Sequence, residues 1–324
     1  MRPLKFHPIL KQTLWGGERI IPYKELASEL SRVGESWELS GMPGSESVVA
    51  EGPWTGSTLP ELIGRFGAEL LGKANYARFG QEFPLLVKFI DAREDLSIQV
   101  HPDDELARKR HGKSGKCEMW YVLEAEPGAS LLTGFSRPIA PAEYERRVAD
   151  NTLTDVLNRQ AIASGDVFYL PAGRVHSIGK GSFIVEIQQS SDITYRIYDF
   201  DRRDAAGNSR ELHTELAREA IDFESSENSR ITYAPENNQE VRLVTTPYFT
   251  TSLYTLTART RCDWSATDSF VAIVLLQGSG SLTDNEGNRI DVRQGETWLL
   301  PASTQWTEIT PVSYTHLRAH ETRG

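Results

Sequence analysis

Four side chains with nitrogen or oxygen donors lie in short segments that have the character of β-strands. Gln99 and His101 are two positions apart, so on a strand both point to the same face. Glu118 begins a run rich in β-forming residues, and His176 closes a strand-like segment after a glycine turn. Three or four such donors from separate strands, without a cysteine among them, predict a divalent-metal site suited to catalysis rather than to structural support.

Two cations and a hydroxyl are expected beside these donors. Lys116 is two residues before Glu118, and Ser97 is two residues before Gln99, so each shares a strand face with a candidate ligand. Arg196 lies in mid-strand among aromatic residues, where its burial is costly unless it faces a cavity or, alternatively, pairs with a core carboxylate. A lysine and an arginine near a metal suit a phosphorylated or enediolate substrate, because they stabilise charge that develops in the transition state. The sequence lacks the Gly-x-x-x-x-Gly-Lys-Ser/Thr loop, which disfavours nucleotide phosphate chemistry.

The composition is that of an ordinary globular protein. The chain has 324 residues, 25% of them charged, and a formal net charge of -10, which disfavours nucleic acid as a partner. No apolar run is long enough to span a membrane, and the first residues lack the apolar core of a signal peptide. Two cysteines, Cys117 and Cys262, are expected to be reduced thiols in a cytoplasmic protein. The oligomeric state is left open.

Glycine and proline divide the chain into short β-like pieces with a few helical insertions. Helical spacing and capping residues predict helices at about 58–79, 102–110, 141–159 and 211–222. Residues 312–324 are polar and basic where a closing strand would be expected. We therefore expect a disordered or artefactual tail there, outside the site.

A repeated sequence segment predicts two related β modules. The segment 165–172 recurs as 295–302, and in this register His176 corresponds to Trp306, so the second copy lacks a ligand there. The first copy, Gly-Asp-x-x-x-x-Pro-Ala-Gly-x-x-His, resembles the second motif of the cupin family, whose barrels hold a metal in their mouth. The expected fold class is mainly β with helical insertions, formed by two cupin-like jelly-roll β-barrel modules and a small helical segment. We expect a catalytic module in residues 1–240 and a module without metal ligands in 241–311.

Several longer motifs, in one order along residues 1–311, resemble the type I mannose-6-phosphate isomerases in their compact bacterial form. They are residues 34–38, 83–92, 96–104, 115–121, 195–199 and 210–213. The resemblance implies a zinc-dependent interconversion of mannose 6-phosphate and fructose 6-phosphate through a cis-enediol, with one Zn²⁺ per chain. It places the metal ligands on Gln99, His101, Glu118 and His176. It also places the catalytic arginine on Arg196, and the strand lysine and serine on Lys116 and Ser97.

The substrate is then a small-molecule sugar phosphate, and the general base is not assigned. Lys116 could contact the phosphate or take part in proton transfer, since a lysine beside a divalent cation can act as a base. Three alternatives stay open. They are a non-catalytic sugar-phosphate-binding cupin, an iron-dependent cupin oxygenase, which would not need Lys116 and Arg196 at the metal, and an isomerase for free mannose.

Overall fold

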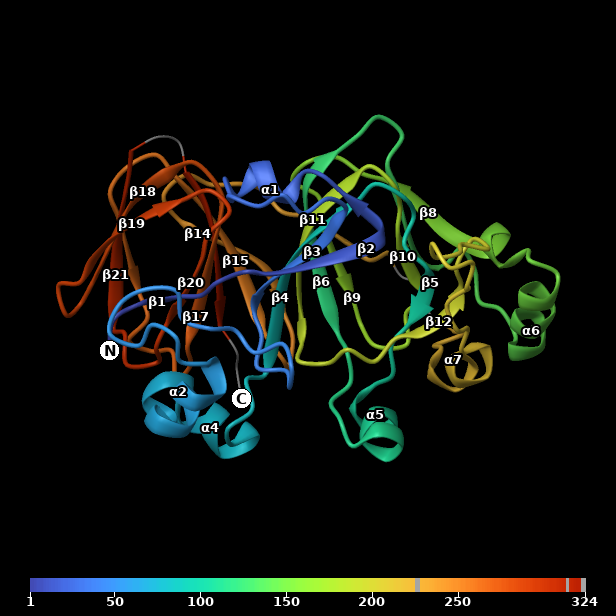
Figure 1. Ribbon diagram of the computed structural model, residues 1–324, viewed down its shortest axis with the longest axis horizontal. Coiled ribbons are helices and arrows are strands. Elements are labelled where there is room, and N and C mark those ends of the chain that lie inside the picture. Colours follow the sequence, from blue (N-terminus) through green and yellow to red (C-terminus); the bar gives the residue numbers. More distant parts are fainter. Residues whose placement is uncertain (225–227, 313–314, 322–324) are drawn as a thin grey trace.

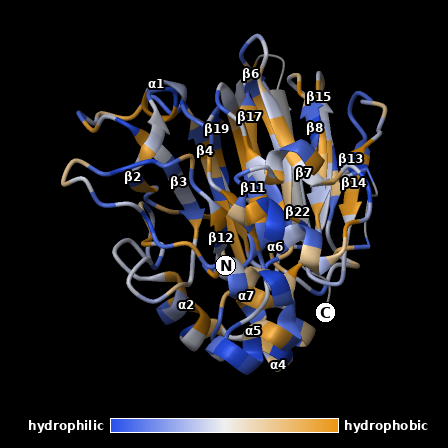
Figure 2. Cartoon of the chain, turned by 90° about the vertical axis from the view of Figure 1, so that its right-hand side faces the viewer, coloured by the Kyte–Doolittle hydropathy of each residue, from blue (hydrophilic) through white to orange (hydrophobic). Residues whose placement is uncertain are grey.

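The structure is a computed structural model that describes residues 1–224, 228–312 and 315–321. Two pairs of β-sheets lie side by side along its long axis, with helices at the edges (Figure 1). Figure 2 shows hydrophobic residues concentrated along the strands, whereas α5 (Asp104–His111), at the lower edge of that view, carries mostly hydrophilic residues. Among the described residues, none of the helices combines the length and apolar character needed to cross a membrane.

The first pair of sheets surrounds the motifs that carry the candidate ligands. Its seven-stranded sheet runs in the order β13 (Arg230–Ile231), β9 (Val167–Leu170), β6 (Glu118–Ala125), β11 (Ser182–Gln189), β4 (Leu85–Ala92), β2 (Ile9–Gly17) and β3 (Val33–Leu39). Its five-stranded sheet runs in the order β12 (Tyr195–Tyr198), β5 (Ile98–Val100), β10 (His176–Ile178), β7 (Ser130–Phe135) and β8 (Leu157–Ala161). One buried cluster, which includes Trp120, Phe168 and Ile178, joins the two sheets. The site residues therefore lie between two sheets held at a fixed spacing by packed side chains.

The second pair of sheets repeats this arrangement without the ligands. Its six-stranded sheet runs in the order β1 (Leu4–Lys5), β20 (Thr297–Leu300), β17 (Val271–Gln277), β22 (Thr315–Glu321), β15 (Thr250–Leu256) and β14 (Glu240–Thr245). Its four-stranded sheet runs in the order β16 (Thr260–Asp263), β21 (Trp306–Pro311), β18 (Ser279–Asp284) and β19 (Arg289–Arg293). The repeated segment forms β9 beside β6 and β20 beside β17, so the sequence repeat corresponds to equivalent strand pairs.

The mainly β fold with helical insertions that the sequence predicts is confirmed. The description as two cupin-like modules agrees with the paired sheets. Over the described strands, however, each sheet stays open and neither pair closes into a barrel through backbone pairing. The two large sheets share an apolar cluster that includes Phe89, Phe183 and Phe270, which explains why β4 and β11 are buried along their whole length.

The helix expected at 58–79 is divided into α2 (Leu59–Phe66), α3 (Ala68–Leu71) and α4 (Lys73–Phe79). Thr58 caps α2, with its side chain accepting from the Glu61 N–H in a capping box. The breaks fall at Gly67 and Gly72, whose φ values are +49° and +91°. A Cβ at Gly72 would lie 2.2 Å from the Asp268 carbonyl oxygen, so the glycine lets the chain approach the second module closely.

The other helices begin or end inside their expected ranges. α5 (Asp104–His111) starts after Pro102 because the Asp103 side chain caps it. The helix expected at 141–159 is too long: α6 (Pro141–Ala149) ends before Asn151, which has a φ of +55°. A 3₁₀ turn (Leu153–Val156) and β8 follow. α7 (Thr214–Ala220) lies within the range 211–222, whereas α1 (Ile20–Tyr23) was not expected.

Within the range expected to be a disordered or artefactual tail, Thr315–Glu321 form the strand β22, so the structure does not show disorder there; the expectation of an artefactual segment stays a prediction. This strand pairs antiparallel with both β15 and β17 in the middle of the six-stranded sheet. The pairings are made by backbone groups, which are the same whatever side chains the strand carries. Polar composition was therefore a poor guide to whether this segment forms a strand. Residues 313–314 and 322–324 of the expected tail lie outside the described residues. At the other end of the chain, β1 pairs with β20, so residues 4–5 join the second pair of sheets rather than the first.

Candidate active site

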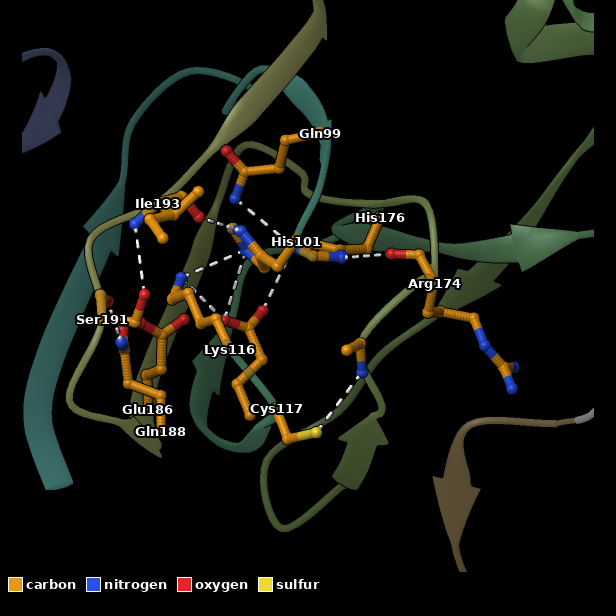
Figure 3. Close-up of polar contacts among 12 residues, drawn as sticks. Gln99, His101, Lys116, Cys117, Arg174, His176, Glu186, Gln188, Ser191 and Ile193 are labelled. Atoms are coloured by element: carbon orange, nitrogen blue, oxygen red, sulfur yellow. Dashed lines mark hydrogen bonds and ion pairs between the residues drawn. The ribbon is translucent and has the colours of Figure 1, made fainter. Parts of the chain in front are cut away.

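Three of the four candidate ligands, His101, Glu118 and His176, converge within the first pair of sheets. Figure 3 shows His101 and His176 beside each other, with Lys116 directed toward His101. His101 directly follows β5, Glu118 is the first residue of β6, and His176 is the first residue of β10. All three side chains are buried, and one donor atom from each lies within 4.8 Å of the others. Residues 75 positions apart in sequence meet here because β10 pairs with β5, the two strands being in register at His176 and Gln99.

The two imidazoles present the same nitrogen to the centre of the cluster. His101 Nδ1 donates to the Ile193 carbonyl oxygen at 2.8 Å, and His176 Nδ1 donates to the Arg174 carbonyl oxygen at 2.8 Å. With the proton on Nδ1, each Nε2 carries a lone pair toward Glu118. His176 Nε2 lies 3.1 Å from Glu118 Oε1, and His101 Nε2 lies 3.6 Å from Glu118 Oε2. Three acceptors thus face one another.

Burial sets the protonation of this cluster. It lowers the pKa of His101 well below its usual value, and the Lys116 charge acts in the same direction. Burial likewise lowers the pKa of His176 to about 4, against the hydrogen bond to the Arg174 carbonyl. It raises the pKa of Glu118 to about 7, although Lys116 opposes this. At neutral pH both imidazoles are therefore neutral, which is the form that binds a metal.

Gln99 lies at the edge of this cluster. Its amide nitrogen is 3.3 Å from His176 Nε2, and Ser97 Oγ donates to its amide oxygen at 3.3 Å. Because a half-turn of the amide exchanges its nitrogen and oxygen, Gln99 can offer an oxygen to an ion held by His176. Ser97 and Gln99 both line the cavity described below, as their shared strand face predicts.

Lys116 points into the ligand cluster rather than away from it. Its Nζ lies 2.8 Å from Glu118 Oε2 and 3.1 Å from His101 Nε2, and the side chain is only 6% exposed. Its ammonium group compensates the Glu118 carboxylate in the absence of another cation. The expected proximity of Lys116 to the candidate ligands is therefore seen in the structure.

A buried ion pair that the sequence did not reveal lies at the same cavity. Lys88 Nζ is 3.1 Å from Glu186 Oε1 and 3.8 Å from Glu35 Oε2. Glu186 also accepts from Trp120 Nε1 at 2.9 Å. Burial would raise the pKa of Glu186, but Lys88 outweighs it, helped by the Lys116 charge and the Trp120 N–H, and the pKa is lowered to about 2. Glu186 is therefore ionised at neutral pH.

Arg196 lines a cavity of about 550 Å³, including its open mouth, together with Lys88, Lys116 and Glu186. Its Nη1 donates to the Glu211 carbonyl oxygen at 2.9 Å, whereas its Nε is buried without a hydrogen-bond partner. Burial, followed by the charge of Arg210, lowers the pKa of Arg196. The alternative in which Arg196 pairs with a core carboxylate does not describe this environment, because it faces a cavity.

Arg210 is a second arginine at the cavity; it belongs to the sequence motif at 210–213, but the sequence did not mark it as a site residue. Asp199 holds it through two hydrogen bonds, of 2.7 Å from Nε and 2.5 Å from Nη2. Such a bidentate pair fixes the guanidinium plane at the cavity wall. The signal that could have identified Arg210 is its place in the same ordered motif series as Arg196.

The donor set fits a divalent cation. Two neutral imidazole nitrogens and a carboxylate face one another, and both Nδ1–H groups are fixed by backbone carbonyls. Histidine and carboxylate ligands with open positions are typical of metal sites that take part in catalysis. His101, Glu118 and His176 would hold the ion, with Gln99 beside them.

Comparison with known proteins places these features in a family. A family model described as phosphomannose isomerase type I, catalytic domain, matches residues 4–132. The mannose-6-phosphate isomerase ManA of Bacillus subtilis is 34% identical over 303 residues, covering 92% of this chain and 93% of the relative. The mannose-6-phosphate isomerase of Streptococcus mutans is 33% identical over 302 residues, covering 92% of each chain. A crystal structure of the mannose 6-phosphate isomerase from Bacillus subtilis superposes with a TM-score of 0.89 at 29% identity, covering 99% of both chains.

Proposed function

The chain belongs to the mannose-6-phosphate isomerase family, and we propose that it interconverts mannose 6-phosphate and fructose 6-phosphate at the cavity beside His101, Glu118 and His176. The observation that carries this proposal is the position of Lys116, whose Nζ lies within 3.1 Å of both His101 Nε2 and Glu118 Oε2. It places a proton-carrying group at the point where sugar oxygens would meet a bound cation. The similarity over nearly the whole chain to relatives named for this reaction supports it.

The proposed cofactor is one Zn²⁺ per chain, held by His101, Glu118 and His176 with Gln99 assisting. When bound, the ion would supply Lewis-acid polarisation of sugar oxygens. Nitrogen and carboxylate ligands suit zinc, and all three of these residues are buried.

The reaction moves a proton between C1 and C2 and a second proton between the two oxygens, through a cis-enediol. Arg196, at the cavity wall with an unpartnered Nε, would stabilise the negative charge of the enediolate. Lys116 would hold or move a proton at the sugar oxygens, because its Nζ is directed into the ligand cluster. Ser97 would contact the bound sugar from the same strand face as Gln99.

The phosphate requires cations, and the cavity wall supplies them. Arg210 lines the cavity, and Asp199 holds its Nε and Nη2 in a fixed plane, so Nη1 is the part of the guanidinium that Asp199 does not engage. Arg210 would therefore help to distinguish a sugar phosphate from a free sugar, while Arg196 acts at the enediolate.

The test compares kcat/KM for mannose 6-phosphate and for mannose, with Zn²⁺ present. We expect a strong preference for the phosphorylated sugar, because the cations at the cavity wall lose a negatively charged partner when the phosphate is removed. Comparable values would favour an isomerase for free mannose. Absence of isomerisation with either sugar, in a protein that binds Zn²⁺, would contradict the proposal.

A further inference from the structure

The side chain of Gln189, the last residue of β11, connects segments that carry the candidate site without itself touching the cavity. Its Oε1 accepts from the Cys117 N–H at 2.9 Å, and its Nε2 donates to Asp104 Oδ1 at 3.0 Å. The backbone N–H of Gln189 also donates to the Cys117 carbonyl oxygen at 3.1 Å. Gln189 is 6% exposed and is not among the described residues that line the cavity. It thus holds Cys117 from both its N–H and its carbonyl side.

Asp104 holds the same segment from the other direction. Its Oδ1 accepts from the Gly115 N–H at 2.8 Å as well as from Gln189. The intervening Lys116 N–H donates to the Pro102 carbonyl oxygen at 3.1 Å. Three consecutive backbone N–H groups, at residues 115–117, are therefore fixed by three different acceptors immediately before β6 begins.

The two segments joined here are in direct backbone contact. A Cβ added to Gly115 would lie 2.5 Å from the Asp103 carbonyl carbon and 2.6 Å from the Asp104 nitrogen. Only glycine permits this approach. One of the two segments carries His101, and the other carries Lys116 and Glu118, so their relative position decides the distances within the ligand cluster.

We propose that Gln189 and Asp104 are positioning residues that set the placement of Lys116 and Glu118 against His101. The distances that depend on them are the 3.1 Å from Lys116 Nζ to His101 Nε2 and the 2.8 Å from Lys116 Nζ to Glu118 Oε2. Catalytic groups are sensitive to displacements of about 1 Å. The kinetic part of this inference rests on the proposed isomerase function, whereas the metal-binding part does not.

Three variants test the connection. Gln189→Ala removes both side-chain hydrogen bonds. Gln189→Glu keeps an acceptor for Cys117 but places a carboxylate against Asp104. The double variant Gln189→Glu with Asp104→Asn removes the repulsion between the two carboxylates. It does not restore every bond, because the Gly115 N–H and Gln189 Nε2 both donate to the same atom, Asp104 Oδ1, and an amide presents either its oxygen or its nitrogen there.

Asn75→Ala provides a matched control. Asn75 is buried and donates to the Leu71 carbonyl oxygen and to Ser269 Oγ, at the contact between α4 and the second module. Substitution of Asn75 also removes buried hydrogen bonds, but Asn75 is not among the described residues that line the cavity. It therefore reports what a loss of stability alone does to the measured quantities.

The measurements are kcat, KM and the affinity for Zn²⁺, each taken where the variant is folded. We expect Gln189→Ala and Gln189→Glu to weaken Zn²⁺ binding and to lower kcat by about tenfold or more, with little change in KM. The double variant should recover part of both losses, because it relieves the repulsion between the two carboxylates. Asn75→Ala should lower the unfolding midpoint and leave kcat and Zn²⁺ affinity unchanged.

Two outcomes would overturn the inference. One is a Gln189→Glu variant whose kcat and Zn²⁺ affinity match those of Asn75→Ala. The other is a double variant no better than Gln189→Glu. If Gln189→Ala fails to fold, the comparison of Gln189→Glu with the double variant still tests the positioning role of Gln189 and Asp104. If the unmodified protein binds Zn²⁺ but isomerises no sugar, the proposed function fails while the Zn²⁺ affinities still test the positioning role.

Discussion

Lys88 and Glu186 lie directly opposite each other on the neighbouring strands β4 and β11, and their side chains form a buried ion pair 3.1 Å long. Both side chains are less than a tenth exposed. Removal of one partner of such a pair destabilises the folded protein, because it leaves the other charge buried without compensation. It also keeps a carboxylate ionised beside the candidate reaction cavity.

Glu186→Gln should therefore destabilise the protein strongly. We expect a loss of about 3 kcal/mol in the free energy of unfolding, at the low end for a broken buried pair because Lys88 keeps Glu35 as a neighbour. Urea denaturation at pH 7 measures it. Asp192→Asn is the control: Asp192 pairs with Lys113 while both side chains are about half exposed, so the expected loss is at most about 1 kcal/mol. Equal losses in the two variants would contradict the buried-pair interpretation.

The same pair makes a prediction in acid. The pKa of Glu186 is lowered to about 2 in the folded protein, below its ordinary value. Its contribution to stability is therefore present above the unfolded pKa and is lost as the pH falls toward the folded pKa. The difference in unfolding free energy between the unmodified protein and Glu186→Gln should shrink from pH 7 to pH 3. A difference that stays constant over this range would contradict it.

His101, Glu118 and Lys116 were predictable because their signals are local. Each lies in a short motif, and same-face spacing on a strand places Lys116 beside Glu118 and Gln99 beside Ser97. Lys88 and Glu186 gave no such signal. Both strands are buried on both faces, so their charged residues interrupt an apolar run rather than alternate with it, and their pairing depends on a register between distant segments.

Boundaries were predicted less well than the existence of elements. Gly67 and Gly72 divide one helical pattern into three, and at Gly72 a tertiary contact with Asp268 needs the close approach that glycine allows. β22 was missed for a different reason. Its place is decided by the two strands that flank it rather than by its own composition.

Removal of one imidazole should remove the metal. His176→Ala deletes one of three convergent donors, and we expect its Zn²⁺ content, measured by elemental analysis after dialysis, to fall to a small fraction of that of the unmodified protein. Chelation of the unmodified protein should abolish turnover, and added Zn²⁺ should restore it. His213→Ala is the matched control, since His213 lies outside the ligand cluster and contacts the Arg196 backbone. Full metal content in His176→Ala would refute the assignment.

Zn²⁺ binding should release a proton below neutral pH. Burial raises the pKa of Glu118 to about 7, so in the metal-free protein this carboxyl group is largely protonated at pH 6 and must lose its proton to bind an ion. His176, with a pKa lowered to about 4, stays neutral at both pH values and releases none. Calorimetric titration with Zn²⁺ in buffers of different ionisation enthalpy should show about one proton released at pH 6 and almost none at pH 8. Equal release at both pH values would argue against Glu118 as a ligand.

Arg196→Ala should separate turnover from folding. Arg196 is half-buried at the cavity wall and donates to a single backbone carbonyl, that of Glu211, so its loss leaves the sheets and the ligand cluster in place. Loss of one preorganised cation should lower kcat by about 10²–10³-fold, while the Zn²⁺ content and the unfolding midpoint change little. Arg159→Ala, which removes an exposed guanidinium bound to Ser130 Oγ, should leave all three quantities unchanged. Arg196→Lys keeps the charge but not the planar fork, so partial recovery of kcat would assign part of the effect to charge alone. A variant of Arg196 that unfolds while the folded fraction keeps full specific activity would make the arginine a structural residue instead.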